Sequence, residues 1–171
     1  MYKRQILNTA LPTLAQDLHA TTTDLQWITD AYTLMFGALL LVAGALGDRY
    51  GRRRALTFGL SVFAVGSVLA ATSDSSSALI AARAVMGLGG AFVMPATLSI
   101  LTSVFPEEER AAAIGAWSGV AGLGIVVGPT LGGFLLEHFA WGAVFWINVP
   151  LVALALALVL RVIPSLPGQR S

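Results

Sequence analysis

The sequence predicts an all-α membrane protein, and three observations predict this class. Hydrophobic residues make up 56% of the 171 residues and charged residues only 11%, against about 25% charged residues in soluble domains. The mean hydropathy is +0.78. The charged residues gather in short segments between apolar stretches long enough to cross a bilayer. A soluble fold of this length could not bury so much apolar surface, so the surrounding solvent must be lipid.

Five apolar stretches reach or approach the roughly 20 residues that a transmembrane helix needs. These predicted spans are residues 27–47, 55–72, 78–104, 111–136 and 141–160, separated by polar or charged breaks at 48–54, 73–77, 105–110 and 137–140. An earlier segment, 6–18, is shorter and more polar. We expect it to be the back half of a truncated first helix, with a signal peptide as the alternative. The bundle then occupies residues 1–161, and a cytoplasmic linker follows over residues 162–171.

Basic residues predict the orientation of the six helices. If the break at 48–54 faces the cytoplasm, that side holds nine of the ten Lys and Arg residues, while the tenth, Arg83, lies within a span. The nine are Lys3, Arg4, Arg49, Arg52, Arg53, Arg54, Arg110, Arg161 and Arg170. Such an asymmetry is typical of cytoplasmic loops. We therefore expect a multi-pass protein of a plasma membrane, bacterial in composition, with both termini in the cytoplasm.

The composition also argues against several kinds of site. Cysteine is absent, which excludes disulfides and thiolate metal sites. The two histidines, His19 and His138, fall in outer loops far apart in the sequence, and no helix carries a paired-carboxylate motif. No basic face with interleaved aromatic residues indicates nucleic-acid binding. We expect no metal, no cofactor and no enzymatic activity.

The most specific segment is GALGDRYGRRRAL, residues 44–56. Asp48 ends a predicted helix, where the helix dipole disfavours an anion, and Arg52 at i+4 can compensate. Gly51 permits a tight turn. A plain cytoplasmic loop with arginines is the alternative.

The segment resembles the signature loop between helices 2 and 3 of the major facilitator superfamily, and every position of that pattern is filled. The matching positions are Gly44, Leu46, Asp48, Arg49, Gly51, Arg52, Arg53 and Leu56. The resemblance implies a cytoplasmic gate that latches one half of a transporter against the other.

The span 78–104 carries a stripe of special residues. Arg83, Gly87, Ala91 and Pro95 follow one another at four-residue steps, and Pro95 leaves the carbonyl of Ala91 without its helical donor. An ionisable group inside a span suggests a function, although an arginine near a helix end can also extend to the membrane surface. Together with Leu79 and Gly89, the stripe resembles the fourth-helix motif of the superfamily. In that motif the arginine is associated with proton coupling.

The span 111–136 contains glycines at four-residue steps. Gly124, Gly128 and Gly132 share one face, Pro129 bends the helix, and Gly133 widens the gap in side chains. Ordinary packing of small residues between membrane helices is the alternative. The spacing resembles the fifth-helix motif of the superfamily's antiporters. It implies export, with this face forming a close helix contact that seals the cytoplasmic side.

The run Trp-Ile-Thr-Asp-Ala-Tyr-Thr-Leu at 27–34 resembles the drug:proton antiporters with fourteen helices. Its acid, Asp30, could take up a proton or pair with a cationic substrate, and an acid exposed to outer water is the alternative. The segment from Asn8 to Pro12 resembles the end of their first helix. Lys3 departs from the family, because these exporters usually carry an acid five positions before that asparagine. The departure removes one expected proton or cation site.

The resemblance covers the chain from residue 8 to about 161. It implies the N-terminal six-helix half of a transporter, built as 3+3 inverted repeats, that exports small cationic or lipophilic drugs by proton-driven alternating access. Asp30 and Arg83 are the candidates for proton coupling, and Asn8 and Met94 for the substrate cavity. Filler in a packed core is the alternative for Met94, as it is for Met86. The partners would be a small-molecule substrate, protons, the lipid bilayer, and a missing C-terminal half or a second copy. A truncated, transport-silent membrane remnant or an interaction module is the alternative.

Overall fold

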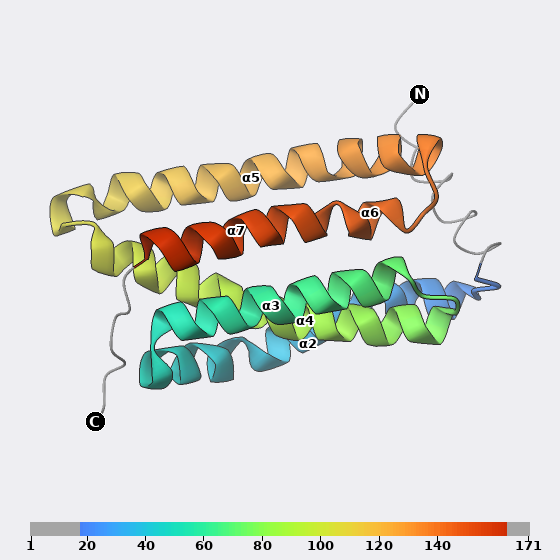
Figure 1. Ribbon diagram of the computed structural model, residues 1–171, viewed down its shortest axis with the longest axis horizontal. Helices are drawn as coiled ribbons and strands as arrows, with labels where there is room; N and C mark the ends of the chain where they lie inside the picture. The colour runs from blue at the N-terminus through green and yellow to red at the C-terminus, as the bar shows by residue number, and fades with distance from the viewer. Residues whose placement is uncertain (1–17, 164–171) are drawn as a thin grey trace.

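The computed structural model describes residues 18–163, and every secondary-structure element within this range is an α-helix (Figure 1). The helices are α2 (Thr22–Tyr50), α3 (Arg52–Ala71), α4 (Ser76–Val104), α5 (Glu107–His138), α6 (Ala143–Trp146) and α7 (Asn148–Val162). Five helical segments are long and apolar enough to cross a membrane, with α6 and α7 counted as one. The predicted all-α membrane class is confirmed. The predicted first span, 6–18, lies outside the described residues except for Leu18.

The tightest packing joins α2, α3 and α4, with α7 against α3, whereas α5 lies on the far side of α7 in Figure 1. Buried residues of α3, α4 and α7 form one core cluster, with Leu56 and Leu60 among them. A second cluster lies toward the opposite end and includes Leu79 and Met86 of α4. Helices α2, α3 and α4 therefore form the tightly packed part of the bundle, and among the described helices α5 contacts only α4 and α6, its neighbours in the sequence.

The break between the first two spans is much shorter than predicted. The sequence suggested a turn over residues 48–54, but α2 continues to Tyr50 and α3 starts at Arg52, so only Gly51 is non-helical. Gly51 has φ 105° and ψ 130°, a backbone conformation that only glycine adopts without strain. Its N–H donates to the Gly47 carbonyl at 3.0 Å, which extends the hydrogen bonding of α2 to the turn itself. The charged residues of the motif are thus held on helices.

Helix α5 extends beyond its predicted span of 111–136. It begins at Glu107, and three glutamates fill its first turn. Negative charge stabilises a helix N-terminus, so these residues continue the helix out of the apolar layer. Hydropathy detects only the part of a helix that lies in lipid, which explains the short prediction.

The last predicted span, 141–160, is interrupted. The four-residue helix α6 ends at Trp146, and α7 starts at Asn148. Pro150 explains the interruption, because it has no N–H to donate to the carbonyl of Trp146 and its ring crowds that carbonyl. The predicted span therefore corresponds to two consecutive helices, which together form one apolar segment of 20 residues.

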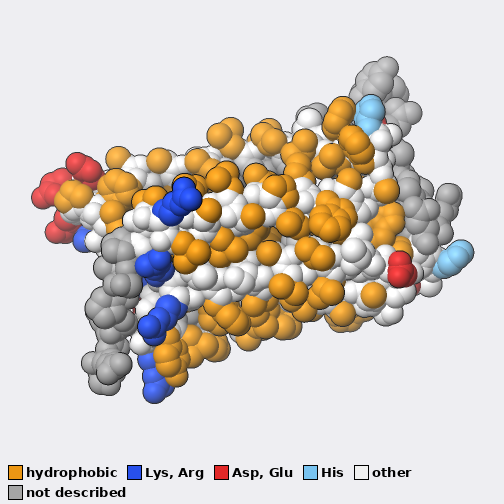
Figure 2. Space-filling view, viewed as in Figure 1, with side chains coloured by type: hydrophobic (Ala, Val, Ile, Leu, Met, Phe, Trp, Pro, Cys, Tyr) orange, Lys and Arg blue, Asp and Glu red, His pale blue; other side chains and the backbone are white. Residues whose placement is uncertain are grey.

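Charged side chains gather at the two ends of the bundle (Figure 2). The helix boundaries place six arginines at the end that contains the α2–α3 turn: Arg49, Arg52, Arg53, Arg54, Arg110 and Arg161. The glutamates of the α5 N-terminus share this end. The other end carries Asp24, Asp74 and Glu137. This separation matches the predicted grouping of basic residues, and which end faces the cytoplasm remains a prediction.

Candidate functional site

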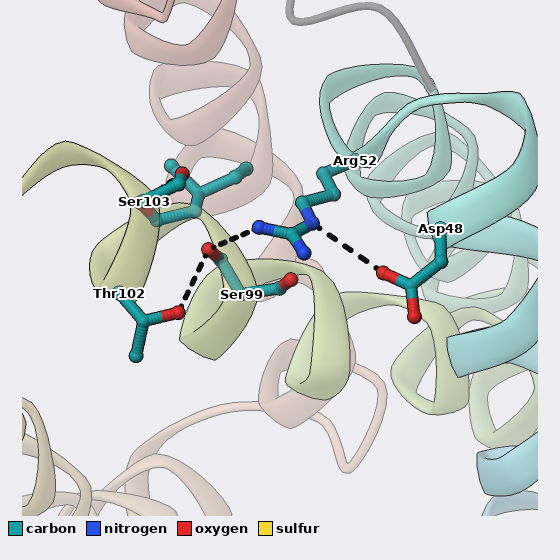
Figure 3. Close-up of polar contacts among 6 residues, drawn as sticks. Asp48, Arg52, Ser99, Thr102 and Ser103 are labelled. Atoms are coloured by element: carbon teal, nitrogen blue, oxygen red, sulfur yellow. Dashed lines mark hydrogen bonds and ion pairs between the residues drawn. The ribbon is translucent and has the colours of Figure 1, made fainter. Parts of the chain in front are cut away.

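Arg52 ties the α2–α3 turn to α4 (Figure 3). Its Nε donates to Asp48 Oδ1 at 3.4 Å, and its Nη1 donates to the Ser99 carbonyl at 3.0 Å. Asp48 is 59% exposed, so the ion pair alone stabilises the turn by only about 0–1 kcal/mol. The bond to Ser99 is partly buried and crosses between helices. One guanidinium therefore joins the end of α2, the start of α3 and the C-terminal part of α4.

Arg53 makes a similar bond to α7. Its Nη2 donates to the Leu160 carbonyl at 2.8 Å. Leu160 is in the last turn of α7, where carbonyls have no partner within the helix. A cation at a helix C-terminus is also favoured by the dipole. Two consecutive arginines thus fasten α4 and α7 to the N-terminus of α3.

The remaining residues of the predicted gate motif make fewer contacts. The Arg49 guanidinium carbon lies 5.5 Å from the centre of the Tyr50 ring, and both side chains are exposed. A Cβ added to Gly44 would lie 3.8 Å from Pro95 Cβ, which is an ordinary contact. The structure therefore brings Asp48, Arg52 and Arg53 into a network with α4 and α7 and leaves Arg49 outside it.

The glycines of the fourth-helix motif let α4 approach two helices. A Cβ added to Gly87 would collide with the backbone carbonyl of Tyr32 in α2 and lie 3.0 Å from Met35 Cβ. A Cβ added to Gly89 would lie 2.6 Å from the Phe63 nitrogen and 2.7 Å from the Gly59 oxygen, both in α3. Helix α4 is therefore in backbone contact with its neighbours on two sides.

Arg83 extends from α4 to α2. It lies seven residues after the start of α4, about 10 Å along the axis at 1.5 Å per residue. Its Nε donates to the Ile28 carbonyl at 2.9 Å, and its guanidinium carbon lies 4.7 Å from the centre of the Tyr32 ring. The side chain is partly buried. It is thus engaged by the neighbouring helix, whereas the alternative interpretation expected it to extend to the membrane surface.

Asp30 does not join Arg83. Helical residues two apart differ by about 200° around the axis, so Asp30 points away from the face of α2 that carries Ile28 and Tyr32. The side chain is exposed, and no ion pair between it and Arg83 occurs within residues 18–163. The two residues assigned to proton coupling occupy separate places in the same end of the bundle.

The glycine face of α5, made by Gly124, Gly128 and Gly132, is open in the described part of the chain. A Cβ added to any of the three would meet nothing within 4 Å. Gly133, in contrast, is buried, and Pro129 lies inside the continuous helix. The face can accept a close neighbour.

The two candidates for the substrate cavity have different outcomes. Met94 is 44% exposed and stays available to a cavity. Asn8 lies outside the described residues. Met86 is 2% exposed, in contact with the Gly66 region of α3, and serves interior packing.

Sequence reasoning missed several residues of these contacts. Ser99 and Leu160 take part through backbone carbonyls, for which no sequence signal exists. Gly59 and Gly66 form the α3 surface against α4. Their seven-residue spacing inside one apolar span was a detectable sign of a packing face.

Comparisons with known proteins bear on the whole chain. The family model of the Major Facilitator Superfamily matches residues 1–171. The methyl viologen resistance protein SmvA of Salmonella typhimurium is 43% identical over 166 residues, which cover 96% of this chain and 34% of that protein. The multidrug efflux pump LfrA of Mycolicibacterium smegmatis is 45% identical, over 94% of this chain and 32% of that protein. The tetracenomycin C resistance and export protein of Streptomyces glaucescens is 41% identical, over 97% of this chain and 31% of that protein.

The chain therefore spans about a third of the length of the curated relatives it matches. Among solved structures, the peptide transporter POT in complex with sulfate superposes with a TM-score of 0.68 at 18% identity. The superposition covers 91% of this chain and 34% of the peptide transporter. At that identity the likeness supports the fold alone. With the family model matched from end to end, the chain belongs to the Major Facilitator Superfamily of transporters and is not an enzyme.

Proposed function

We propose that this chain supplies the N-terminal half of a proton-driven exporter of small cationic or lipophilic drugs. The observation that carries the proposal is the Arg52 network, in which one guanidinium joins Asp48 to the Ser99 carbonyl of α4. A gate needs rigid ends that move together, and this network couples three helices at one end of the bundle. The relatives named for drug resistance and efflux support export of small molecules as the task.

The mechanism assigns a role to each group of residues. The substrate lies near the membrane midplane between two halves, and the halves rock to expose it to either side. Asp30 takes up a proton from the outer end, and Arg83 provides a positive charge nearby. Exposure of Asp30 supports its access to protons or to a cation. The network of Asp48, Arg52 and Arg53 holds the cytoplasmic ends of the helices.

A second half completes the cavity in this proposal. It would come from further sequence corresponding to the rest of the relatives, or from a second copy. The open face at Gly124, Gly128 and Gly132 supports such a contact, because a helix backbone can approach it closely. Met94, partly exposed on α4, would line the cavity.

A chimera tests the proposal. The matched N-terminal residues of the Salmonella methyl viologen resistance protein are replaced by this chain, and the chimera is expressed in a strain that lacks the resistance protein. We expect methyl viologen resistance and ethidium efflux that a protonophore abolishes. Asp30→Asn should remove both, while Asp74→Asn, an exposed acid at the same end, should leave them intact.

The outcome separates the proposal from its alternative. A chimera that reaches the membrane at the level of the native resistance protein but gives no efflux would contradict the proposal. That result would favour a transport-silent membrane protein or an interaction module. Efflux that Asp30→Asn leaves unchanged would remove Asp30 from the mechanism.

A further inference from the structure

The Arg83 guanidinium is held by two neutral groups of α2. The Ile28 carbonyl accepts from Nε at 2.9 Å, and the Tyr32 ring lies under the guanidinium carbon at 4.7 Å from its centre. Its two Nη groups make no hydrogen bond or ion pair within residues 18–163. Since no carboxylate neutralises it there, the cation keeps donors available to another group.

The Tyr32 ring is itself fixed in position. It packs against the second core cluster, and it stacks on Phe36 with ring centres 6.0 Å apart and planes 16° apart. Gly87 and Gly90 of α4 leave the space that the Tyr32 backbone and hydroxyl approach. A cation over the face of an aromatic ring within about 6 Å of its centre is attracted by the ring's quadrupole. The position of the Arg83 guanidinium fits this interaction, and the packed Tyr32 ring holds the guanidinium on one face.

We infer that Tyr32 is the positioning residue for Arg83: its ring face and the Ile28 carbonyl fix the guanidinium at the α2–α4 interface. The inference rests on the proposed proton-coupled function, in which the charge of Arg83 must stay in one place during the transport cycle. The ring is the required element, because the contact is with its face, so phenylalanine can replace tyrosine. An aliphatic residue cannot.

A spectroscopic experiment on the full chain tests the geometry without any transport. The chain is labelled with ¹⁵N-arginine and placed in lipid nanodiscs, and the Arg83 side-chain resonance is assigned by its loss in Arg83→Lys. We expect the Arg83 guanidinium protons to be shifted upfield by the ring current. The shift should persist in Tyr32→Phe and in the packing control Phe36→Leu and disappear in Tyr32→Leu. An Arg83 resonance that is the same in the unmodified chain and in Tyr32→Leu would overturn the inference.

The chimera described above tests the consequence for function. We expect Tyr32→Leu to lower protonophore-sensitive efflux by roughly tenfold, which corresponds to loss of a partly desolvated cation–π contact. Tyr32→Phe should retain efflux, and Phe36→Leu should change it far less than Tyr32→Leu does, because Phe36 packs beside the ring without touching the cation. Equal losses in Tyr32→Leu and Phe36→Leu would assign Tyr32 a packing role only and overturn the inference. If the unmodified chimera does not transport, the proposed function fails, and the nanodisc comparison alone decides the placement of Arg83.

Discussion

Alanine at Gly89 should destabilise the bundle, whereas alanine at Gly124 should stabilise it. The new Cβ at Gly89 would lie 2.6 Å from the Phe63 nitrogen, about 0.8 Å short of an ordinary contact of 3.4 Å. Both obstructing atoms, this nitrogen and the Gly59 oxygen, belong to the backbone of α3, so α3 and α4 must move apart. Overpacking of this kind costs about 1–3 kcal/mol, and the better helix propensity of alanine returns at most about 1 kcal/mol. We expect a net loss of about 1–2 kcal/mol.

The matched change at Gly124, which has no proline beside it, meets open space within 4 Å. Only the helix propensity then acts, and we expect a gain of up to about 1 kcal/mol. The two free energies of unfolding are measured on the full chain in mixed micelles, by circular dichroism during titration with a denaturing detergent. Equal stability of Gly89→Ala and the unmodified chain would refute the packing argument. A loss at Gly124 would instead show that a segment covers that face.

Three further changes test individual contacts. Ser67→Ala should raise the free energy of unfolding by about 1 kcal/mol, because the Ser67 hydroxyl is buried without a hydrogen-bond partner in the described structure. Ser73→Ala is its control and should lower the free energy of unfolding by a similar amount, since that hydroxyl donates to a backbone carbonyl at 2.7 Å. Changes of the same sign in the two variants would contradict the assignment of Ser67 as an unpaired hydroxyl. Arg53→Gln should speed amide exchange in the last turn of α7, measured by mass spectrometry, because the Leu160 carbonyl loses its donor; unchanged exchange would show that the bond does not hold the turn. Thr21→Ala should destabilise the start of α2 by about 1 kcal/mol through loss of its capping box, and protection of the first turn that persists would argue against this cap.

Much of the fold was predictable because lipid imposes a simple rule on the sequence. Apolar stretches of sufficient length identified five spans, and polar breaks located the connections within a few residues. The ends of helices were less predictable. Helix α5 starts at Glu107 since a favourable dipole outweighs low hydropathy, and the α2–α3 turn contracts to Gly51 because one positive φ reverses the chain. The break between α6 and α7 is due to Pro150, and an average of hydropathy over the span does not register a single proline.

The candidate site was predictable where it depends on a short separation in the sequence. Asp48 and Arg52 are four residues apart, and they meet across Gly51 at 3.4 Å. The glycines of α4 marked a close approach but not the helix approached. Tertiary partners required the structure: the Leu160 carbonyl is 107 residues from Arg53, and backbone acceptors leave no mark in a sequence.

The separation of Asp30 and Arg83 shows a second kind of limit. The sequence located both residues near the same membrane surface, but it could not show whether their side chains meet. Their angular positions on α2 and α4 decide whether they meet, and those depend on how the helices are rotated in the bundle. The structure aligns Ile28 and Tyr32 with Arg83 and directs Asp30 elsewhere.

The most direct test of the central claim is proton-driven movement of a cationic drug through a transporter that contains this chain. The purified chimera is reconstituted in liposomes, a pH gradient is imposed, and accumulation of methyl viologen is followed against empty liposomes. The proposed function predicts accumulation that requires the gradient, stops when nigericin collapses it, and is lost in Asp30→Asn. Accumulation of equal size without a pH gradient, or none above empty liposomes, would contradict it.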